Sequence, residues 1–142
     1  METNDPAAAA EVMAVLDAET KAFWDKDFDA FARCWGSEAY VRRGGWWQRG
    51  GIAWLRGWDT LADLAQRQFA ENPAPNPSAQ AVRRENLSVR VGADMAWVTF
   101  DQYAPDAGEA EMDMPGLSHE TRILERRDGG WVIVYMSYLL VG

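Results

Sequence analysis

The sequence predicts an α+β fold in which a curved antiparallel sheet packs on N-terminal helices and encloses a pocket. The first indication lies in residues 118–140, where Asp128-Gly129 separates two long runs rich in Ile, Val, Thr, Tyr and Trp. An Asp-Gly pair between such runs favours a hairpin, because a tight turn needs positive φ. The second indication is that helical patterns come early and four strand patterns follow one another at the end, which is typical of segregated α+β folds. A curved sheet that closes over a helix leaves a cavity, where small ligands commonly bind.

Length and charge restrict the class of protein. A chain of 142 residues predicts one domain, 1–142, with residues 1–6 expected to be frayed. The net charge of −8 argues against non-specific binding to nucleic acid or to an anionic membrane surface, because both need a basic face. The sequence shows no signal-peptide pattern and no apolar run of roughly 18 residues. We therefore expect a cytoplasmic protein, and its single cysteine, Cys34, fits a reducing compartment.

Three helices are predicted in the first half of the chain. Residues 7–25 form the first, preceded by Asp5-Pro6 as a start signal. The second begins at Asp27 and ends at Gly36, and its apolar residues recur at helical spacing. The third begins with Asp59 as its capping residue.

Strand patterns occupy most of the rest. They cover residues 39–47, 51–56, 82–91 and 95–103 and the two arms of the final hairpin. Residues 105–116 form an acidic segment that we expect to be a loop. Its alternating carboxylates do not have the fixed spacing of a cation site, so we expect a solvated loop and no metal; they are Glu109, Glu111 and Asp113.

Residues 120–134, ETRILERRDGGWVIV, resemble the last hairpin of SnoaL-like proteins in the nuclear-transport-factor-2-like superfamily. Within that superfamily the chain is most similar to the association domain of calcium/calmodulin-dependent protein kinase II and its bacterial stand-alone relatives. The resemblance implies a conical roll, usually dimeric through its sheet, with a pocket inside the cone. Because the superfamily includes isomerases, dehydratases, epoxide hydrolases, cyclases and non-catalytic assembly domains, the resemblance indicates the fold and leaves the activity open. Three further stretches agree with it: Asp27-Phe28-Asp29, Gly57-Trp58-Asp59 and Asp101-Gln102-Tyr103.

Two arginines are the main candidates for binding a ligand. Comparison with the association domain places Arg43 and Arg122 inside the cone, together with the face of residues 95–103 that carries Thr99. Guanidinium groups bind carboxylates and phosphates, so an organic anion is the expected ligand. The alternatives are solvated arginines, arginines in a dimer interface, or a purely structural pair with Glu19. The candidate ligand-binding residues are Arg122, Arg43, Trp97, Thr99, Tyr103, Glu19, Trp47 and Trp54.

Candidates for catalysis are weaker. Asp101 could act as a base with Tyr103 as its partner if apolar neighbours raise its pKa. The only histidine, His119, is expected on the surface or the rim. The resemblance lowers the expectation of catalysis, because Arg43 replaces the catalytic aspartate of related steroid isomerases. No motif for a nucleotide, metal or redox cofactor occurs, so none is expected.

Three functions remain open. The first is a small-molecule binding protein that holds an organic anion or aromatic acid in the cone. The second is an isomerase, cyclase or dehydratase that uses Asp101 and Tyr103. The third is an assembly module. An apolar row on the last strand predicts a homodimer through the sheet; it consists of Val132, Val134, Met136 and Tyr138.

Overall fold

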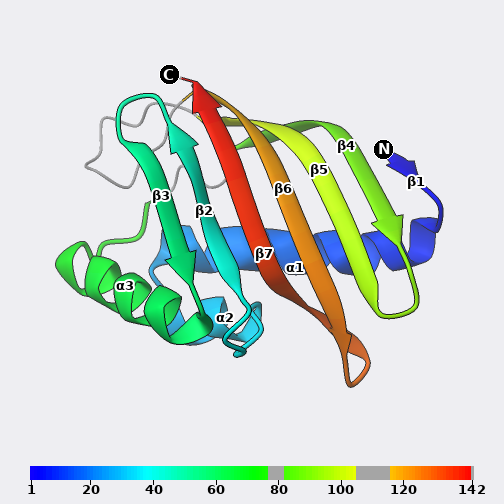
Figure 1. The fold of residues 1–142 in the computed structure, drawn as a ribbon, viewed down its shortest axis with the longest axis horizontal. Helices are drawn as coiled ribbons and strands as arrows, with labels where there is room; N and C mark the ends of the chain where they lie inside the picture. The colour runs from blue at the N-terminus through cyan, green and yellow to red at the C-terminus, as the bar shows by residue number, and fades with distance from the viewer. Residues whose placement is uncertain (77–81, 105–115, 142) are drawn as a thin grey trace.

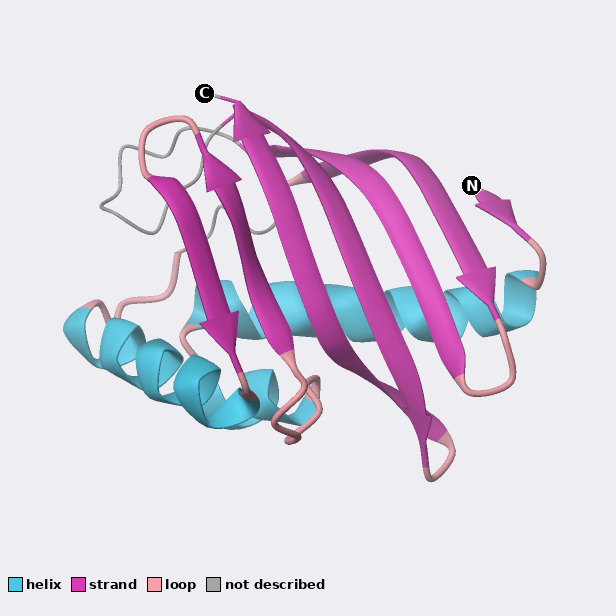
Figure 2. Cartoon of the chain, viewed as in Figure 1, coloured by secondary structure: helices cyan, strands magenta, loops and turns pink. Residues whose placement is uncertain are grey.

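The computed structural model describes residues 1–76, 82–104 and 116–141 and forms a curved sheet with helices on one face (Figures 1 and 2). The sheet has seven strands in the order β1-β4-β5-β6-β7-β2-β3. The acidic segment with Glu109, Glu111 and Asp113 lies outside the described residues. In chain order the elements are β1 (Glu2–Thr3), α1 (Pro6–Asp25), α2 (Phe28–Arg33), β2 (Arg42–Trp47), β3 (Gly51–Arg56), α3 (Trp58–Glu71), β4 (Arg83–Val91), β5 (Met95–Ala104), β6 (Gly116–Arg127) and β7 (Gly130–Val141).

Helix α1 begins as predicted, but the residues before it are ordered. The Asp5 side chain accepts a hydrogen bond from the backbone N–H of Ala8 at 3.1 Å, and Pro6 occupies the first turn. The expectation that residues 1–6 are frayed is wrong, because β1 pairs in parallel with β4. The Asn4 side chain adds two hydrogen bonds to the backbone of Val91, at 2.8 and 2.9 Å. The N-terminus thus covers the edge of β4.

The other two helices differ slightly from prediction. Asp27 caps α2 through a hydrogen bond from the backbone N–H of Ala30, and the helix ends at Arg33, before Gly36. Helix α3 begins at Trp58, with Gly57 rather than Asp59 as its N-cap residue and no side-chain cap. Gly57 has a φ of 87°, a backbone conformation that glycine adopts at little cost.

The predicted final hairpin is confirmed. Asp128 and Gly129 both have positive φ, and β6 pairs with β7 in antiparallel fashion on either side of them. The register shifts between Ile123 and Leu124, which leaves one extra residue in β7. On the side of the shift nearer the Asp128-Gly129 turn, Ile133 is opposite Leu124. On the other side, Met136 is opposite Arg122. The bulge therefore changes which residues of β7 face the helices.

The sheet is mixed rather than wholly antiparallel. Strand β2 pairs with β7 in parallel, and β3 then pairs with β2 in antiparallel fashion to form the other edge. This arrangement follows from the order of the chain. The β4–β7 meander starts beside β1 and ends against β2, while α1 crosses one face behind the strands in Figure 1. We call the face toward α1 the inner face and the opposite one the outer face.

The register shows which residues of β5 lie on the inner face. Val98 is opposite Arg122, and both side chains are buried, whereas Trp97 is 56% exposed. The prediction that Trp97 and Thr99 lie inside the cone is therefore wrong. Directly paired residues share one face of a sheet, so an inward Arg122 requires an inward Val98. The buried core on the inner side includes Val12, Leu16, Phe31, Val89, Ala96, Val98, Phe100, Leu124 and Ile133.

Candidate functional site

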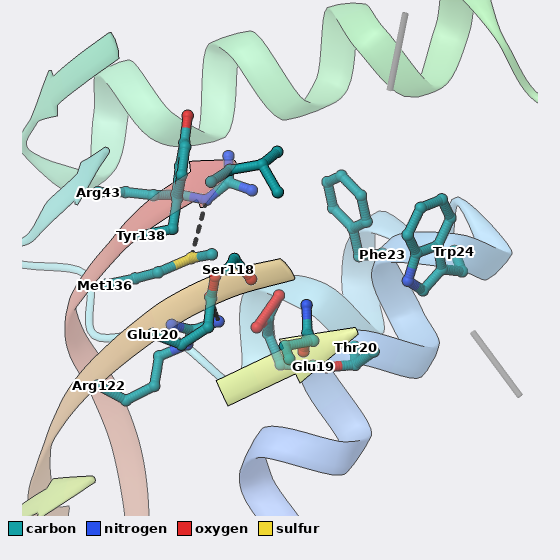
Figure 3. Close-up of a pocket in the computed structure, with 12 residues that line it drawn as sticks. Glu19, Thr20, Phe23, Trp24, Arg43, Ser118, Glu120, Arg122, Met136 and Tyr138 are labelled. Atoms are coloured by element: carbon teal, nitrogen blue, oxygen red, sulfur yellow. Dashed lines mark hydrogen bonds and ion pairs between the residues drawn. The ribbon is translucent and has the colours of Figure 1, made fainter. Parts of the chain in front are cut away.

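A cavity of about 80 Å³ lies between α1 and the inner face of the sheet (Figure 3). The paired residues of β6, β7 and β2 supply its sheet side, where Arg122, Met136 and Arg43 follow one another across the three strands. The opposite side comes from α1. The lining residues are Glu19, Thr20, Phe23, Trp24, Arg43, Gln102, Ser118, Glu120, Arg122, Met136, Tyr138 and Leu140.

The α1 wall contains two aromatic residues, Phe23 and Trp24, that are not among the candidates predicted from sequence. Glu19, Thr20, Phe23 and Trp24 are separated by one and four positions, so they occupy one side of consecutive helical turns. Phe23 and Trp24 pack edge to face, with ring centroids 5.4 Å apart. Their helical spacing from Glu19 is the sequence signal that indicates this wall.

Arg122 is buried in an ion pair. Its guanidinium lies 2.8 Å from the carboxylate of Glu120, and the two side chains are 5% and 4% exposed. The same guanidinium lies 5.3 Å from the ring centroid of Phe100, and that of Arg84 lies 5.1 Å from it. Glu120 therefore neutralises Arg122 within the protein.

Arg43 has a different environment. Its Nε donates to the sulfur of Met136 at 3.3 Å, and its guanidinium lies 5.5 Å from the ring centroid of Phe23. It makes no ion pair with any residue in the described part of the chain. Burial lowers the pKa of Arg43, and the charge of Glu19 opposes that shift. Because an arginine side chain keeps its charge in proteins, the cavity contains a cation whose protein contacts are mainly apolar.

Glu19 is the second ionisable side chain of the cavity that has no ion-pair partner among the described residues. It is 5% exposed, and among the described residues it forms neither a hydrogen bond nor an ion pair. Burial raises the pKa of Glu19, while the positive charges of Arg122, Arg43 and Arg84 counteract it. Figure 3 shows Glu19 on α1 and Arg43 on the strand side of the same cavity.

The other predicted aromatic walls lie elsewhere. Trp54 is 42% exposed and packs edge to face against Tyr135, which is outside the cavity lining. The Tyr103 ring lies under the guanidinium of Arg83, at 4.5 Å. Trp47 is opposite Leu140, a lining residue, but does not itself line the cavity.

Asp101 lies on the outer face, where it binds His119. The Asp101 carboxylate is 2.6 Å from Nδ1 of His119 and accepts a hydrogen bond from Asn86 at 2.8 Å. Hydrogen bonds from Asn86 and His119 lower the pKa of Asp101. The expectation that apolar neighbours raise this pKa is therefore wrong, and Asp101 does not contact the cone.

Cys34 and the possible metal ligands are the other reactive groups among the described residues. Burial raises the pKa of the Cys34 thiol to about 11, which leaves it protonated and unreactive. Within residues 1–76, 82–104 and 116–141, no cluster of three or more potential metal ligands occurs. None of the helices in these ranges combines the length and apolarity needed to cross a membrane.

The chain belongs to the SnoaL-like domain family, whose model matches residues 12–138. None of the curated proteins matches it. This family membership confirms the resemblance seen in the final hairpin.

Solved structures show the same fold. A cystatin-like fold protein from Burkholderia xenovorans is 20% identical, with a TM-score of 0.68 over 98% of this chain and 95% of that one. A putative calcium/calmodulin-dependent protein kinase type II association domain from Thiobacillus denitrificans is 17% identical, with a TM-score of 0.66 and coverages of 92% and 94%. The hub homology domain of the same kinase from Chlamydomonas reinhardtii is 24% identical, with a TM-score of 0.64 and coverages of 95% and 99%. These similarities establish the NTF2-like α+β cone.

Proposed function

We propose that this protein binds a small organic anion in its cone, with Arg43 as the anchoring residue. The observation that carries the proposal is the guanidinium of Arg43, a half-buried residue that lines the cavity and has no carboxylate partner among the described residues. Buried charges need partners, and a ligand carboxylate supplies one with the geometry that guanidinium prefers. Arg122, the leading candidate from sequence, already has Glu120. We assign Arg122 to holding the shape and charge of the cavity.

The size of the cavity fits a small organic anion. Its volume of about 80 Å³ exceeds what a single water needs, so it can admit a short carboxylate such as propionate. Phe23, Met136 and Tyr138 supply the surface for its carbon chain.

A thermal-shift comparison tests the proposal. Acetate, propionate and benzoate are titrated onto the wild type, Arg43→Gln and Arg42→Gln. Arg42 is the matched control, because it neighbours Arg43 on β2 but lies outside the cavity lining. Binding to the folded state at a hundred times the dissociation constant stabilises it by about 2.7 kcal/mol. We expect a rise in Tm with propionate for the wild type and Arg42→Gln and its loss in Arg43→Gln.

Two results would contradict the proposal. An equal rise in Tm for Arg43→Gln would show that the anion binds elsewhere. No rise with any of the three acids would argue against anion binding in the cone.

An assembly role through the outer face is the second candidate. Large apolar side chains are exposed there, and two similar structures are described as an association domain and a hub homology domain. Exposed apolar patches often mark contacts between proteins, so we propose a homodimer through the sheet. The exposed residues are Trp46, Ile52, Trp54, Trp97, Leu139 and Val141.

Sedimentation over a range of concentrations tests this second candidate. We expect a dimer mass for the wild type and dissociation to the monomer in Leu139→Lys. Glu11→Lys, an exposed change on α1, is the control. A monomer mass for the wild type at all concentrations would contradict the homodimer.

The enzyme alternative has less support. Neither Asp101 nor Tyr103 lines the cavity, so the two residues proposed for acid–base chemistry do not meet a ligand in the cone.

A further inference from the structure

The cavity brings together two cations and two carboxylates, of which only Arg122 and Glu120 form an ion pair. We propose that the cone takes up an organic anion together with one proton, which is held by Glu19, a step that rests on the proposed binding of an anion at Arg43. Taken together, the anion that binds at Arg43 and the proton that binds at Glu19 are equivalent to one molecule of a weak acid.

Charge balance leads to this conclusion. Arg122 and Glu120 cancel, so the charge of the cavity depends on Arg43 and Glu19. If Glu19 is ionised, the four groups sum to zero and a bound anion adds an uncompensated negative charge in a buried place, which is costly. If Glu19 is protonated, the cavity carries one positive charge and the anion neutralises it.

The groups around Glu19 explain why binding moves the proton. Burial favours its neutral form, and so does the negative charge of Glu120 on β6. The opposing positive charges come from Arg122 on β6, Arg43 on β2 and Arg84 on β4. From the remaining sides, the nearby groups are neutral at pH 7: Gln102 on β5, Tyr138 on β7 and the thiol of Cys34 after α2.

Each of the three cations has, or acquires, another partner. Arg122 pairs with Glu120, and Arg84 pairs with Asp17. The third cation, Arg43, pairs with the bound anion. Together with Glu120, that anion makes a second negative charge in the cavity near Glu19. Binding therefore removes support for the ionised carboxylate, and Glu19 takes up a proton.

The proposal also separates two classes of ligand. A simple carboxylate needs a protonated Glu19. A zwitterion would instead pair its ammonium group with an ionised Glu19 and leave the proton count unchanged. We therefore expect propionate to bind more tightly than 3-aminopropionate, which has the same carboxylate and carbon chain.

Calorimetric titration of propionate provides the test. It is run between pH 6 and 8.5, where propionate is ionised, in pairs of buffers with different ionisation enthalpies, so that the protons taken up on binding are counted. The proteins are the wild type, Glu19→Gln, and Glu11→Gln as the matched exposed control on α1. Glutamine imitates the protonated carboxyl group but cannot take up a proton.

We expect uptake of up to one proton per propionate in the wild type. Over that interval the affinity then falls as the pH rises, at most tenfold per pH unit, because the stoichiometry of bound protons sets the slope. Glu11→Gln should behave like the wild type. Glu19→Gln should bind propionate with no proton uptake and with an affinity that does not change with pH.

Three results would overturn the inference. Propionate binding to the wild type without proton uptake would overturn it and leave the proposed function intact. Tighter binding of 3-aminopropionate would show that Glu19 stays ionised. Absence of propionate binding to both the wild type and Glu19→Gln would overturn the inference together with the proposed function. If Glu19→Gln does not fold, the proton count of the wild type still decides.

Discussion

The inner and outer faces of the sheet come from the same strands but place charge in different surroundings. On the inner face, Arg122 and Glu120 pair at 2.8 Å with both side chains at or below 5% exposure. On the outer face, the Asp101–His119 pair has side chains that are 23% and 58% exposed. Solvent screens the outer pair, whereas the inner one depends on its partner for almost all of its compensation.

The faces also differ in how they use aromatic residues. The outer face exposes Trp46, Trp54 and Trp97, whereas the aromatic residues of the cavity are Phe23, Trp24 and Tyr138. A high tryptophan content therefore does not by itself indicate a pocket. The position of each residue relative to the strand register decides whether it meets a ligand, the core or solvent.

The largest expected difference between the faces comes from two residues of β5 that lie three positions apart. Phe100 is buried between the guanidinium groups of Arg84 and Arg122, and its replacement removes core packing and both cation–π contacts. We expect Phe100→Ala to lower the free energy of unfolding by about 3–5 kcal/mol. Trp97→Ala, on the exposed side of the same strand, should lower it by less than about 1 kcal/mol.

Urea unfolding followed by circular dichroism measures both changes. A Trp97→Ala variant that loses more stability than Phe100→Ala would mean that the two faces of β5 have been assigned the wrong way round.

A smaller effect distinguishes the buried ion pair from an exposed one. Glu120→Gln leaves the Arg122 guanidinium buried without its counter-charge, and we expect a loss of about 3 kcal/mol. The control is Glu85→Gln, which breaks the exposed Arg83–Glu85 pair and should cost less than about 1 kcal/mol. If Glu120→Gln and Glu85→Gln lower the free energy of urea unfolding equally, the expected difference between the buried and the exposed ion pair is contradicted.

Local patterns predicted much of the fold from sequence. The Asp128-Gly129 turn, the Asp5 and Asp27 caps and the helical and strand spacings are set by residues close together in the chain. Such signals need no knowledge of distant contacts.

The errors arose where distant residues determine the outcome. Alternation places Trp97 and Val98 on opposite faces but does not say which one is inner. Pairing with β6 decides that question, since Val98 is opposite Arg122. The expected apolar row on β7 fails for a related reason, because the bulge beside Leu124 turns Met136 and Tyr138 toward the cavity. That row therefore gives no support to the homodimer.

The candidate site was predicted in outline. Arg43, Arg122 and Glu19 all line the cavity, but their roles depend on which charges are already paired. That Glu120 is the partner of Arg122 follows from two residues of one strand facing the same side. That Arg43 has no such partner is a property of the folded environment, which spacing along the chain does not encode.

A crystal structure of the wild type with propionate would show whether Arg43 binds an anion in the cone. We expect the propionate carboxylate on the Arg43 guanidinium, with the carbon chain against Phe23 and Tyr138. Propionate bound only on the outer face, or an Arg43 guanidinium left without the carboxylate while propionate occupies the cone, would contradict that expectation.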